Sequence, residues 1–380
     1  MTTQTDTLKQ TESATQQADQ PIPQPIAQIC KLDKDAPVKV LGRSALLATG
    51  IALDHSAATL EFTLVGSGDA WLTGKASKDI YFTVFIDNIR QEKRVLFTVG
   101  TNEMKIASNL SDGTHTVRVV RQTEEKYGTF DAQFIRFSHG MFGEKPQEKP
   151  IYIEFVGDSI TCGSGALHHF LTSDDALTYR TEATNVCIGE GGEPVIEEDA
   201  SCSYAYHCAQ MLDADYSLIS YSGIGVARTW GGESSILMPT YYGYLAQQRL
   251  GSHAFDFDSA RKPDMVVINL GTNDGFLVNN SAFSGAMSKI EYTLAVQDFI
   301  TQIRIQWNDP DLKIVWATGL MGKALSDWTK EAIESMDDEN VYHFTGMTEG
   351  RDGHNGHPTW QQQTVGASQL TAFLKQLGRR

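Results

Sequence analysis

Between residues 38 and 137, apolar and polar side chains alternate along the chain in several segments. In TLEFTLV, the residues Leu60, Phe62 and Leu64 alternate with polar neighbours, as expected of a strand with one buried and one solvated face. The segments YFTVFID and THTVRVV repeat this pattern, and Ser111-Asp112-Gly113 is typical of a turn between strands. Short strands without a long helical segment predict an all-β domain, a jelly-roll sandwich, over residues 35–140.

A different pattern begins after Pro150. The runs IYIEFV, YSLISYS, DMVVINLG and KIVWATGL are apolar throughout, which is typical of strands buried on both faces of a parallel sheet. Apolar residues at helical spacing predict a helix over 292–307 and a shorter one over 370–377. Residues 151–380 are therefore expected to form a three-layer α/β domain, joined to the first domain by a polar linker over 141–150.

The composition limits the partners. The chain of 380 residues has a formal net charge of −16, which repels phosphate backbones and disfavours nucleic acid. No segment reaches the roughly 18–20 apolar residues that cross a bilayer, so no membrane partner is expected. Residues 1–34 are Gln- and Thr-rich without the features of a secretory signal, so we expect a disordered leader. Five cysteines are too few for a disulfide scaffold, and both a Cys187–Cys202 pair and unpaired thiols stay open.

Residues capable of chemistry follow three of the predicted strands. The first strand ends in Gly-Asp-Ser at Ser159, the second in YSGIG around Gly223, and the third in LGTND around Asn273. Near the C-terminus, RDGHNGHPTW places His354 and His357 before the last predicted helix. Because ligands bind at the carboxyl ends of the strands in open parallel sheets, we expect these residues to meet in one site.

These residue types are the parts needed for acyl transfer. A serine hydroxyl is a weak nucleophile until an imidazole takes its proton, and a histidine with a pKa near ~6.5 can later return that proton to the leaving alcohol. The negative oxygen that forms needs fixed donors, for which the backbone amides of Ser159 and Gly223 and the side chain of Asn273 are candidates. A glycine lets the substrate approach the main chain closely.

Each feature alone also has a structural explanation. Gly-Asp-Ser often caps a helix, asparagine in a turn often bonds the backbone, and a histidine before proline can simply begin a helix. Asp352, His354 and His357 have a spacing seen in zinc sites, but no second cluster offers a further ligand. The order of the motifs at successive strand ends favours a hydrolase over these alternatives.

The segments GDSIT, SGIG, GTND and GHP resemble the ordered motifs of the SGNH (GDSL-type) hydrolase superfamily. By this resemblance, Ser159 would be the nucleophile and one oxyanion donor, Gly223 and Asn273 the other donors, and His357 the base. The segments LGRSALL, TLEFTL, VFIDN and LSDGTHTVRVVRQTEEKYGTF are similar to the N-terminal jelly roll of the second carbohydrate esterase family, and the resemblance covers most of residues 35–378.

This resemblance implies a two-domain acetyl esterase that removes O-acetyl groups from sugars or plant polysaccharides. An acetylated carbohydrate would then be its substrate, and the reaction would need no metal and no organic cofactor. The resemblance also implies a secreted or periplasmic location. Because no signal peptide is evident in the chain, a cytoplasmic location stays open.

The sequence departs from the family pattern in two places. Residues 168–196 look like an insertion beside the mouth of the site. The superfamily has an Asp three positions before the histidine, or two positions before it in many of these esterases. This chain has His354 three positions before His357 and Asn355 two positions before it. Asp352 is the nearest acid, so a Ser–His dyad and a triad with Asp352 are both open, and the dyad is slightly favoured.

Two tryptophans follow these motifs. Trp230 comes after the glycine motif and Trp360 after the histidine motif, and each is a candidate platform for a sugar ring or a structural core residue. Two other functions also stay open: a carbohydrate-binding protein with a decayed esterase site, and an SGNH hydrolase that acts on lipid esters or thioesters. The oligomeric state is not determined by the sequence.

Overall fold

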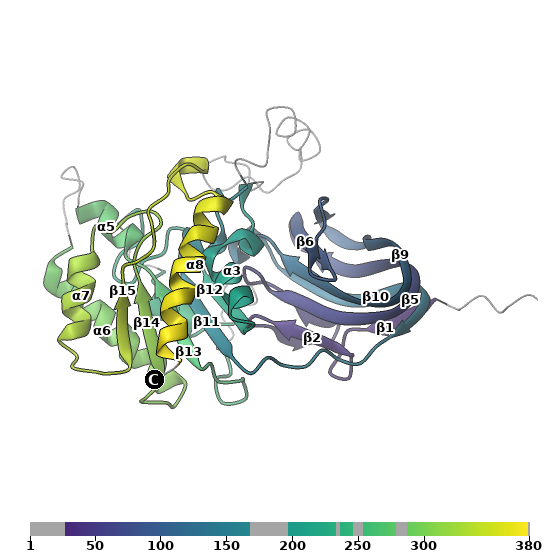
Figure 1. The fold of residues 1–380 in the computed structure, drawn as a ribbon, viewed down its shortest axis with the longest axis horizontal. Coiled ribbons are helices and arrows are strands. Elements are labelled where there is room, and N and C mark those ends of the chain that lie inside the picture. The colour runs from purple at the N-terminus through teal and green to yellow at the C-terminus, as the bar shows by residue number, and fades with distance from the viewer. Residues whose placement is uncertain (1–26, 168–196, 233–235, 246–253, 279–286, 379–380) are drawn as a thin grey trace, which may run out of the picture.

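The computed structural model describes residues 27–167, 197–232, 236–245, 254–278 and 287–378. The chain forms an N-terminal β domain and a C-terminal α/β domain that lie side by side (Figure 1). The predicted insertion at 168–196, which includes Cys187, lies outside the described residues. Among the helices that are described, none combines the length and the apolar character needed to span a bilayer.

The β domain contains β1 (Gln28–Lys31), β2 (Val38–Leu41), β3 (Ala45–Leu47), β4 (Gly50–Ala52), β5 (Thr59–Ala76), β6 (Ile80–Ile86), β7 (Ile89–Arg90), β8 (Val95–Phe97), β9 (Gly100–Arg121), the 3-10 turn η1 (Glu125–Tyr127) and β10 (Phe130–Phe142). The ten strands form one sheet, with the main order β3-β4-β10-β5-β9-β6-β7, and neighbouring strands are antiparallel. This confirms a strand-rich N-terminal half. Leu60 and Leu64 from one half of β5 and Ala70 and Leu72 from the other lie in the same apolar core, so the long strands curve around it.

Three glycines lie next to one another in the middle of the long strands. Gly66 of β5 pairs with Gly113 of β9 on one side and with Gly140 of β10 on the other. A Cβ at Gly66 would lie 2.3 Å from the carbonyl oxygen of His139, so this close approach requires glycine. The strand register shifts beside this row, and such bulges bend a strand. The predicted turn at Ser111-Asp112-Gly113 is therefore wrong, because these residues form an irregular part of β9.

Both predicted ends of the β domain need correction. β1 pairs with β10 from Gln28 to Lys31, so the disordered leader expected over residues 1–34 is wrong for this segment. Its four residues, QICK, are too few to show an alternating pattern in the sequence. At the other end, β10 continues to Phe142, past the expected boundary at residue 140. The linker without helix or strand covers residues 143–151.

The α/β domain contains β11 (Tyr152–Gly157), α1 (Ser159–Cys162), η3 (Ala200–Cys202), α3 (Tyr204–Met211), β12 (Asp215–Ser220), α4 (Met238–Tyr242), β13 (Met265–Asn269), α5 (Thr272–Val278), α6 (Lys289–Gln306), β14 (Lys313–Ala317), α7 (Ser326–Glu334), β15 (Val341–Phe344), η4 (His354–Gly356) and α8 (Trp360–Leu377). Its sheet is parallel, in the order β12-β11-β13-β14-β15. The predicted parallel sheet is confirmed. The edge strand β15 was not predicted, because its sequence VYHF is short and only half-buried.

Successive residues of the sheet enter different apolar cores. Phe155 and Val267 pack in one core with residues of α3 and α8, whereas their neighbours Val156 and Ile268 pack in another with residues of α4, α6 and α7. Helices therefore cover both faces of the sheet, which explains why its strands are apolar throughout. The predicted helix over 292–307 is α6, and the predicted terminal helix is the last part of α8.

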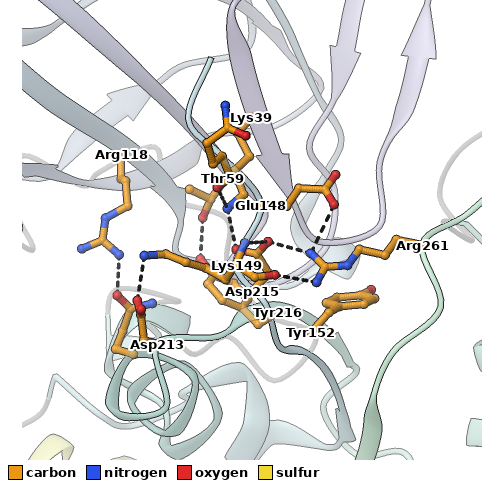
Figure 2. Close-up of polar contacts among 12 residues, drawn as sticks. Lys39, Thr59, Arg118, Glu148, Lys149, Tyr152, Asp213, Asp215, Tyr216 and Arg261 are labelled. Carbon is orange, nitrogen blue, oxygen red and sulfur yellow. Dashed lines mark hydrogen bonds and ion pairs between the residues drawn. The ribbon is translucent and has the colours of Figure 1, made fainter. Parts of the chain in front are cut away.

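Buried polar contacts join the two domains (Figure 2). Lys39 of β2 forms a 2.5 Å ion pair with Asp215 at the start of β12, and both side chains are almost fully buried. Arg261 binds the same carboxylate at 2.8 Å, and the main-chain N–H of Lys149 in the linker donates to it at 2.9 Å. Phe85 of the β domain lies in the same apolar core as α3 and α8. Because a buried charge is costly unless it is paired, these contacts favour one fixed arrangement of the domains.

Candidate active site

Ser159 is the first residue of α1, two positions after the end of β11, which is an inner strand of the sheet. Asp158 caps this helix, because its Oδ1 accepts a hydrogen bond from the N–H of Ile160 at 3.0 Å. The carbonyl oxygen of Asp158 accepts the N–H groups of Thr161 and Cys162. The N–H of Ser159, at the start of this helix, has no acceptor among the described residues.

His357 approaches Ser159 from the loop that precedes α8. Its Nε2 lies 2.7 Å from Ser159 Oγ, although 198 positions separate the two residues in the sequence. The carbonyl oxygen of His357 accepts the N–H of Gly353 at 2.7 Å, which closes the loop. The side chain of Gln363 in α8 donates to the carbonyl oxygen of Ile160 at 3.0 Å and so ties α8 to the helix of Ser159. The hydroxyl and the imidazole are therefore within proton-transfer distance.

Asp352 is exposed, and its carboxylate accepts a hydrogen bond from the side-chain amide of Gln362 at 2.7 Å. The Oε1 of Gln362 accepts the N–H of Asp352 at 3.3 Å and that of Thr359 at 3.0 Å, completing a capping box at the start of α8. The structure therefore directs the carboxylate of Asp352 to Gln362. The side chain of His354 lies outside what the structure describes.

Gly223 and Asn273 follow β12 and β13, and both line the cavity that contains the Ser–His pair. Gly223 has a φ of +83°, a conformation that favours glycine. Asn273 is 7% exposed, and its Nδ2 donates to the carbonyl oxygen of Ile224 at 2.8 Å and to Asp158 Oδ2 at 3.1 Å. The structure thus brings the four residues that match the superfamily motifs together in one place.

Two buried carboxyl groups support these loops. Asp274 accepts the main-chain N–H groups of residues 226–228, and this fixes the segment that follows Gly223. Burial raises the pKa of Asp274. Burial likewise raises the pKa of Asp158 to about 7, since desolvation outweighs the opposing hydrogen bond from Ile160, and the nearby charge of Asp274 adds to the increase.

The cavity around Ser159 has a volume of about 1260 Å³. Trp230 lies on its wall with 57% of its surface exposed, and its ring is 5.4 Å, centroid to centroid, from that of Phe276, which also lines the cavity. Lys126 and Tyr127, from η1 of the β domain, line the cavity as well. Both domains therefore contribute to the site.

The structure brings Trp230 to the cavity but not Trp360. Trp360 packs against Ala166, Leu167 and Cys202, and it is not among the described residues that line the cavity. The start of α8 places this side chain, three positions after His357, in a small apolar cluster. Cys202 is a buried free cysteine, and its suggested partner Cys187 lies outside the described residues.

Sequence reasoning missed several polar residues of the site. Glu124 and Glu198 are almost fully buried, and Lys126, Glu198 and Ser164 line the cavity. The run TEEKYG, which contains Glu124, is highly charged and follows a predicted strand, so it has the composition of a solvated turn. The one signal that could have drawn attention to it is the density of charge in so short a segment.

Two protein-family models match the chain. Residues 40–144 match the model described as Carbohydrate esterase 2 N-terminal, and residues 153–321 match GDSL-like Lipase/Acylhydrolase. The two matches lie on the β domain and on the part of the α/β domain that carries Ser159, Gly223 and Asn273.

Relatives among curated proteins are esterases by name. The chain is 27% identical over 340 residues to the cellulase/esterase CelE of Acetivibrio thermocellus, a match that covers 84% of this chain and 37% of CelE. The chain thus spans 37% of the length of that relative. It is 23% identical over 354 residues to an acetylxylan esterase / glucomannan deacetylase of Cellvibrio japonicus, which covers 90% of this chain and 89% of that protein.

Solved structures share the whole two-domain fold. A family two carbohydrate esterase from Clostridium thermocellum in complex with cellohexaose has a TM-score of 0.76 at 25% identity, covering 90% of this chain and 99% of that one. The acetyl xylan esterase Est2A from the rumen bacterium Butyrivibrio proteoclasticus has a TM-score of 0.78 at 21% identity, covering 93% and 99%, and at this identity the likeness shows the fold alone. The chain therefore combines a domain that matches Carbohydrate esterase 2 N-terminal with a domain that matches GDSL-like Lipase/Acylhydrolase, and it has the two-domain architecture of the family two carbohydrate esterase from Clostridium thermocellum.

Proposed function

We propose that this chain is a carbohydrate O-acetyl esterase in which Ser159 is the nucleophile and His357 the general base. The observation that carries the proposal is the 2.7 Å distance between Ser159 Oγ and His357 Nε2, in a cavity also lined by Gly223 and Asn273. The esterase names of the relatives support the enzyme class. The acetyl group and the sugar are the further step that we propose.

The proposed reaction has two halves. Ser159 Oγ attacks the acetyl carbonyl carbon while its proton moves to His357 Nε2, and the carbonyl oxygen becomes negatively charged. When this intermediate collapses, the bond to the sugar oxygen breaks, and His357 returns the proton to that oxygen, which leaves as an alcohol. Water then attacks the acetyl group on Ser159 with His357 again as the base, so acetate is released and the serine hydroxyl is restored.

Three donors would stabilise the negative oxygen: the N–H groups of Ser159 and Gly223 and the side-chain amide of Asn273. In the structure both hydrogens of the Asn273 amide are engaged, one with the carbonyl oxygen of Ile224 at 2.8 Å and one with Asp158 at 3.1 Å. The bond to Asp158 is the longer one, and we propose that Asn273 shares this hydrogen with the oxyanion when the ester is attacked.

We propose a Ser–His dyad rather than a triad with Asp352. The hydrogen bond of the Asp352 carboxylate to Gln362 supports this choice, because it holds one carboxylate oxygen at the capping residue of α8. The loop bonds of Gly353 and Gln363 support the position of His357 by holding its backbone and the start of α8.

A sugar substrate fits the lining of the cavity. Trp230 and Phe276 offer an aromatic wall for the apolar face of a sugar ring, while Lys126, Tyr127 and Glu198 offer polar groups for its hydroxyls. A secreted or periplasmic location would suit an enzyme that acts on polysaccharide. The helices on both faces of the parallel sheet support the three-layer description of the α/β domain, and the curved antiparallel strands support the jelly-roll description of the β domain.

The test is acetate release from acetylated xylan and acetylated cello-oligosaccharides by the chain and by Ser159→Ala. We expect release by the chain and none by the variant, with unchanged circular dichroism. A p-nitrophenyl ester series from acetyl to decanoyl should show the highest kcat/KM at acetyl. Preference for long acyl chains would contradict the carbohydrate assignment and favour a lipid ester, whereas glycan binding without acetate release would favour a binding protein.

A further inference from the structure

A loop of the β domain reaches the oxyanion loop of the α/β domain. Glu124, which lies between β9 and η1, is fully buried, and its Oε2 accepts the main-chain N–H of Ser222 at 2.6 Å. Ser222 directly precedes Gly223, so this carboxylate binds the peptide next to the proposed oxyanion donor. A hydrogen bond to an ionised carboxylate is roughly twice as strong as one between neutral groups.

Arg121, at the end of β9, holds the loop that carries Glu124. Its buried guanidinium donates to the carbonyl oxygens of Thr123 at 2.7 Å, Glu124 at 3.1 Å and Gly128 at 2.6 Å, and also to that of Leu53 at 2.7 Å. One rigid planar group therefore fixes both ends of the loop against the body of the β domain. The position of the Glu124 carboxylate is set by this framework.

Further contacts connect Glu124 with the segment after Ser159. The ammonium group of Lys126 lies 3.1 Å from Glu124 Oε1, and the N–H of Glu124 donates to Glu198 Oε1 at 2.7 Å. The hydroxyl of Ser164, just beyond α1, donates to Glu198 Oε2 at 3.0 Å. A continuous hydrogen-bonded path thus runs from Ser222 through Glu124 and Glu198 to Ser164, between the two segments that supply main-chain oxyanion donors.

We infer that Glu124 is a positioning residue, which holds the peptide of Ser222 so that the N–H of Gly223 is aimed at the oxyanion. This inference rests on the proposed function, since it assigns a role within that reaction. An oxyanion hole works because its donors are fixed before the charge forms, and a displacement of about 1 Å can cost roughly 10²-fold in rate. The β domain thereby contributes to the chemistry through the geometry of the α/β domain.

The test compares Glu124→Gln with Glu125→Gln in the full chain. Glu125 is an equally buried neighbour whose Oε2 accepts the hydroxyl of Tyr241 in α4 at 2.8 Å, so this control replaces a buried carboxylate that binds a different element of the α/β domain. For Glu124→Gln we expect kcat on p-nitrophenyl acetate to fall about 10- to 100-fold with KM within roughly 3-fold. Glu125→Gln should keep kcat within roughly 3-fold, because it leaves the Ser222 contact intact.

A second measurement separates positioning from a general structural effect. A thionoester develops its negative charge on sulfur, which is larger and a weaker hydrogen-bond acceptor than oxygen, so an intact oxyanion hole favours the oxygen ester. We expect the ratio of kcat/KM for p-nitrophenyl acetate to that for its thiono analogue to fall in Glu124→Gln and to stay unchanged in Glu125→Gln.

The inference is overturned if Glu124→Gln leaves both kcat and the ratio of kcat/KM for the two esters unchanged. It is also overturned if both variants lose kcat equally and the ratio is unchanged. If Glu124→Gln does not fold, Glu124→Asp takes its place, because it keeps the charge and withdraws the carboxylate by one methylene. Activity retained by Ser159→Ala would instead mean that the proposed function itself has failed, and the two failures are therefore distinguishable.

Discussion

The side-chain amide of Gln362 donates a 2.7 Å hydrogen bond to the carboxylate of Asp352, the nearest acid before His357 in the sequence. Gln362 also forms the capping box with Thr359 at the start of α8. We therefore expect Asp352→Asn to keep kcat/KM for p-nitrophenyl acetate within roughly 3-fold, because loss of a true orienting acid costs serine proteases about 10⁴-fold. A loss of that size in Asp352→Asn, with unchanged thermal unfolding, would show that a triad operates.

Removing the side-chain oxyanion donor should affect the chemical step. We predict that Asn273→Ala lowers kcat about 10²- to 10³-fold with little change in KM, since an oxyanion donor acts mainly in the transition state. Steady-state kinetics with p-nitrophenyl acetate, alongside a thermal melt, check this. A variant that raises KM but keeps kcat would indicate that Asn273 binds the ground state and is not part of the oxyanion hole.

The carboxyl group of Asp158 should make stability depend on pH. Burial raises its pKa from 3.8 to about 7, so the folded protein binds this proton more tightly than the unfolded chain does. The stability linked to this group is therefore fully present below about pH 4 and is lost as the pH rises towards 7. Asp158→Asn removes the titration, so the free energy of unfolding of the chain should fall relative to that of the variant between these pH values.

Urea unfolding of the chain and of Asp158→Asn across this pH range measures the difference between their free energies of unfolding. Other groups, such as His55 with its pKa lowered to about 4 by burial, titrate in both proteins and cancel in the difference. A difference that stays constant with pH would show that Asp158 titrates at the same pH in the folded and unfolded states.

The aromatic wall should matter for sugars and not for small esters. We predict that Trp230→Ala raises KM for acetylated cello-oligosaccharides roughly 2- to 10-fold, the range expected for loss of one aromatic contact, and leaves KM for p-nitrophenyl acetate unchanged. Trp71→Ala is a matched control, since Trp71 packs under Arg136 in the β domain and is not among the described residues lining the cavity. Equal effects on both substrates would contradict a sugar-binding role for Trp230.

The sequence predicted the sheet architecture where a periodic pattern repeats over several segments. The fully apolar runs around Phe155 and Val267 predict buried parallel strands, and the structure confirms them. The bend at Gly66 was not predictable in the same way, because glycine and its small neighbours occur both in turns and in bulges. Only the pairing of Gly66 with Gly113 and Gly140 across three strands distinguishes the two cases.

For the site, prediction succeeded where topology decides the position. Ser159, Gly223 and Asn273 follow the carboxyl ends of parallel strands, and such ends meet at one edge of a sheet. The contacts of Asp352 and Glu124 depend instead on which group elsewhere in the chain reaches them. For Asp352 this group is the side chain of a capping glutamine, and for Glu124 it is a main-chain N–H of the other domain. Spacing along the chain does not carry that information.

The most direct test of the account is a double-mutant cycle of Ser159→Ala and His357→Ala, measured as kcat on p-nitrophenyl acetate. If the two residues act as one unit across their 2.7 Å contact, each single variant and the double variant should lose activity to about the same residual level. Substantial activity in Ser159→Ala, or losses that simply add in the double variant, would contradict the assignment of Ser159 and His357 as nucleophile and base.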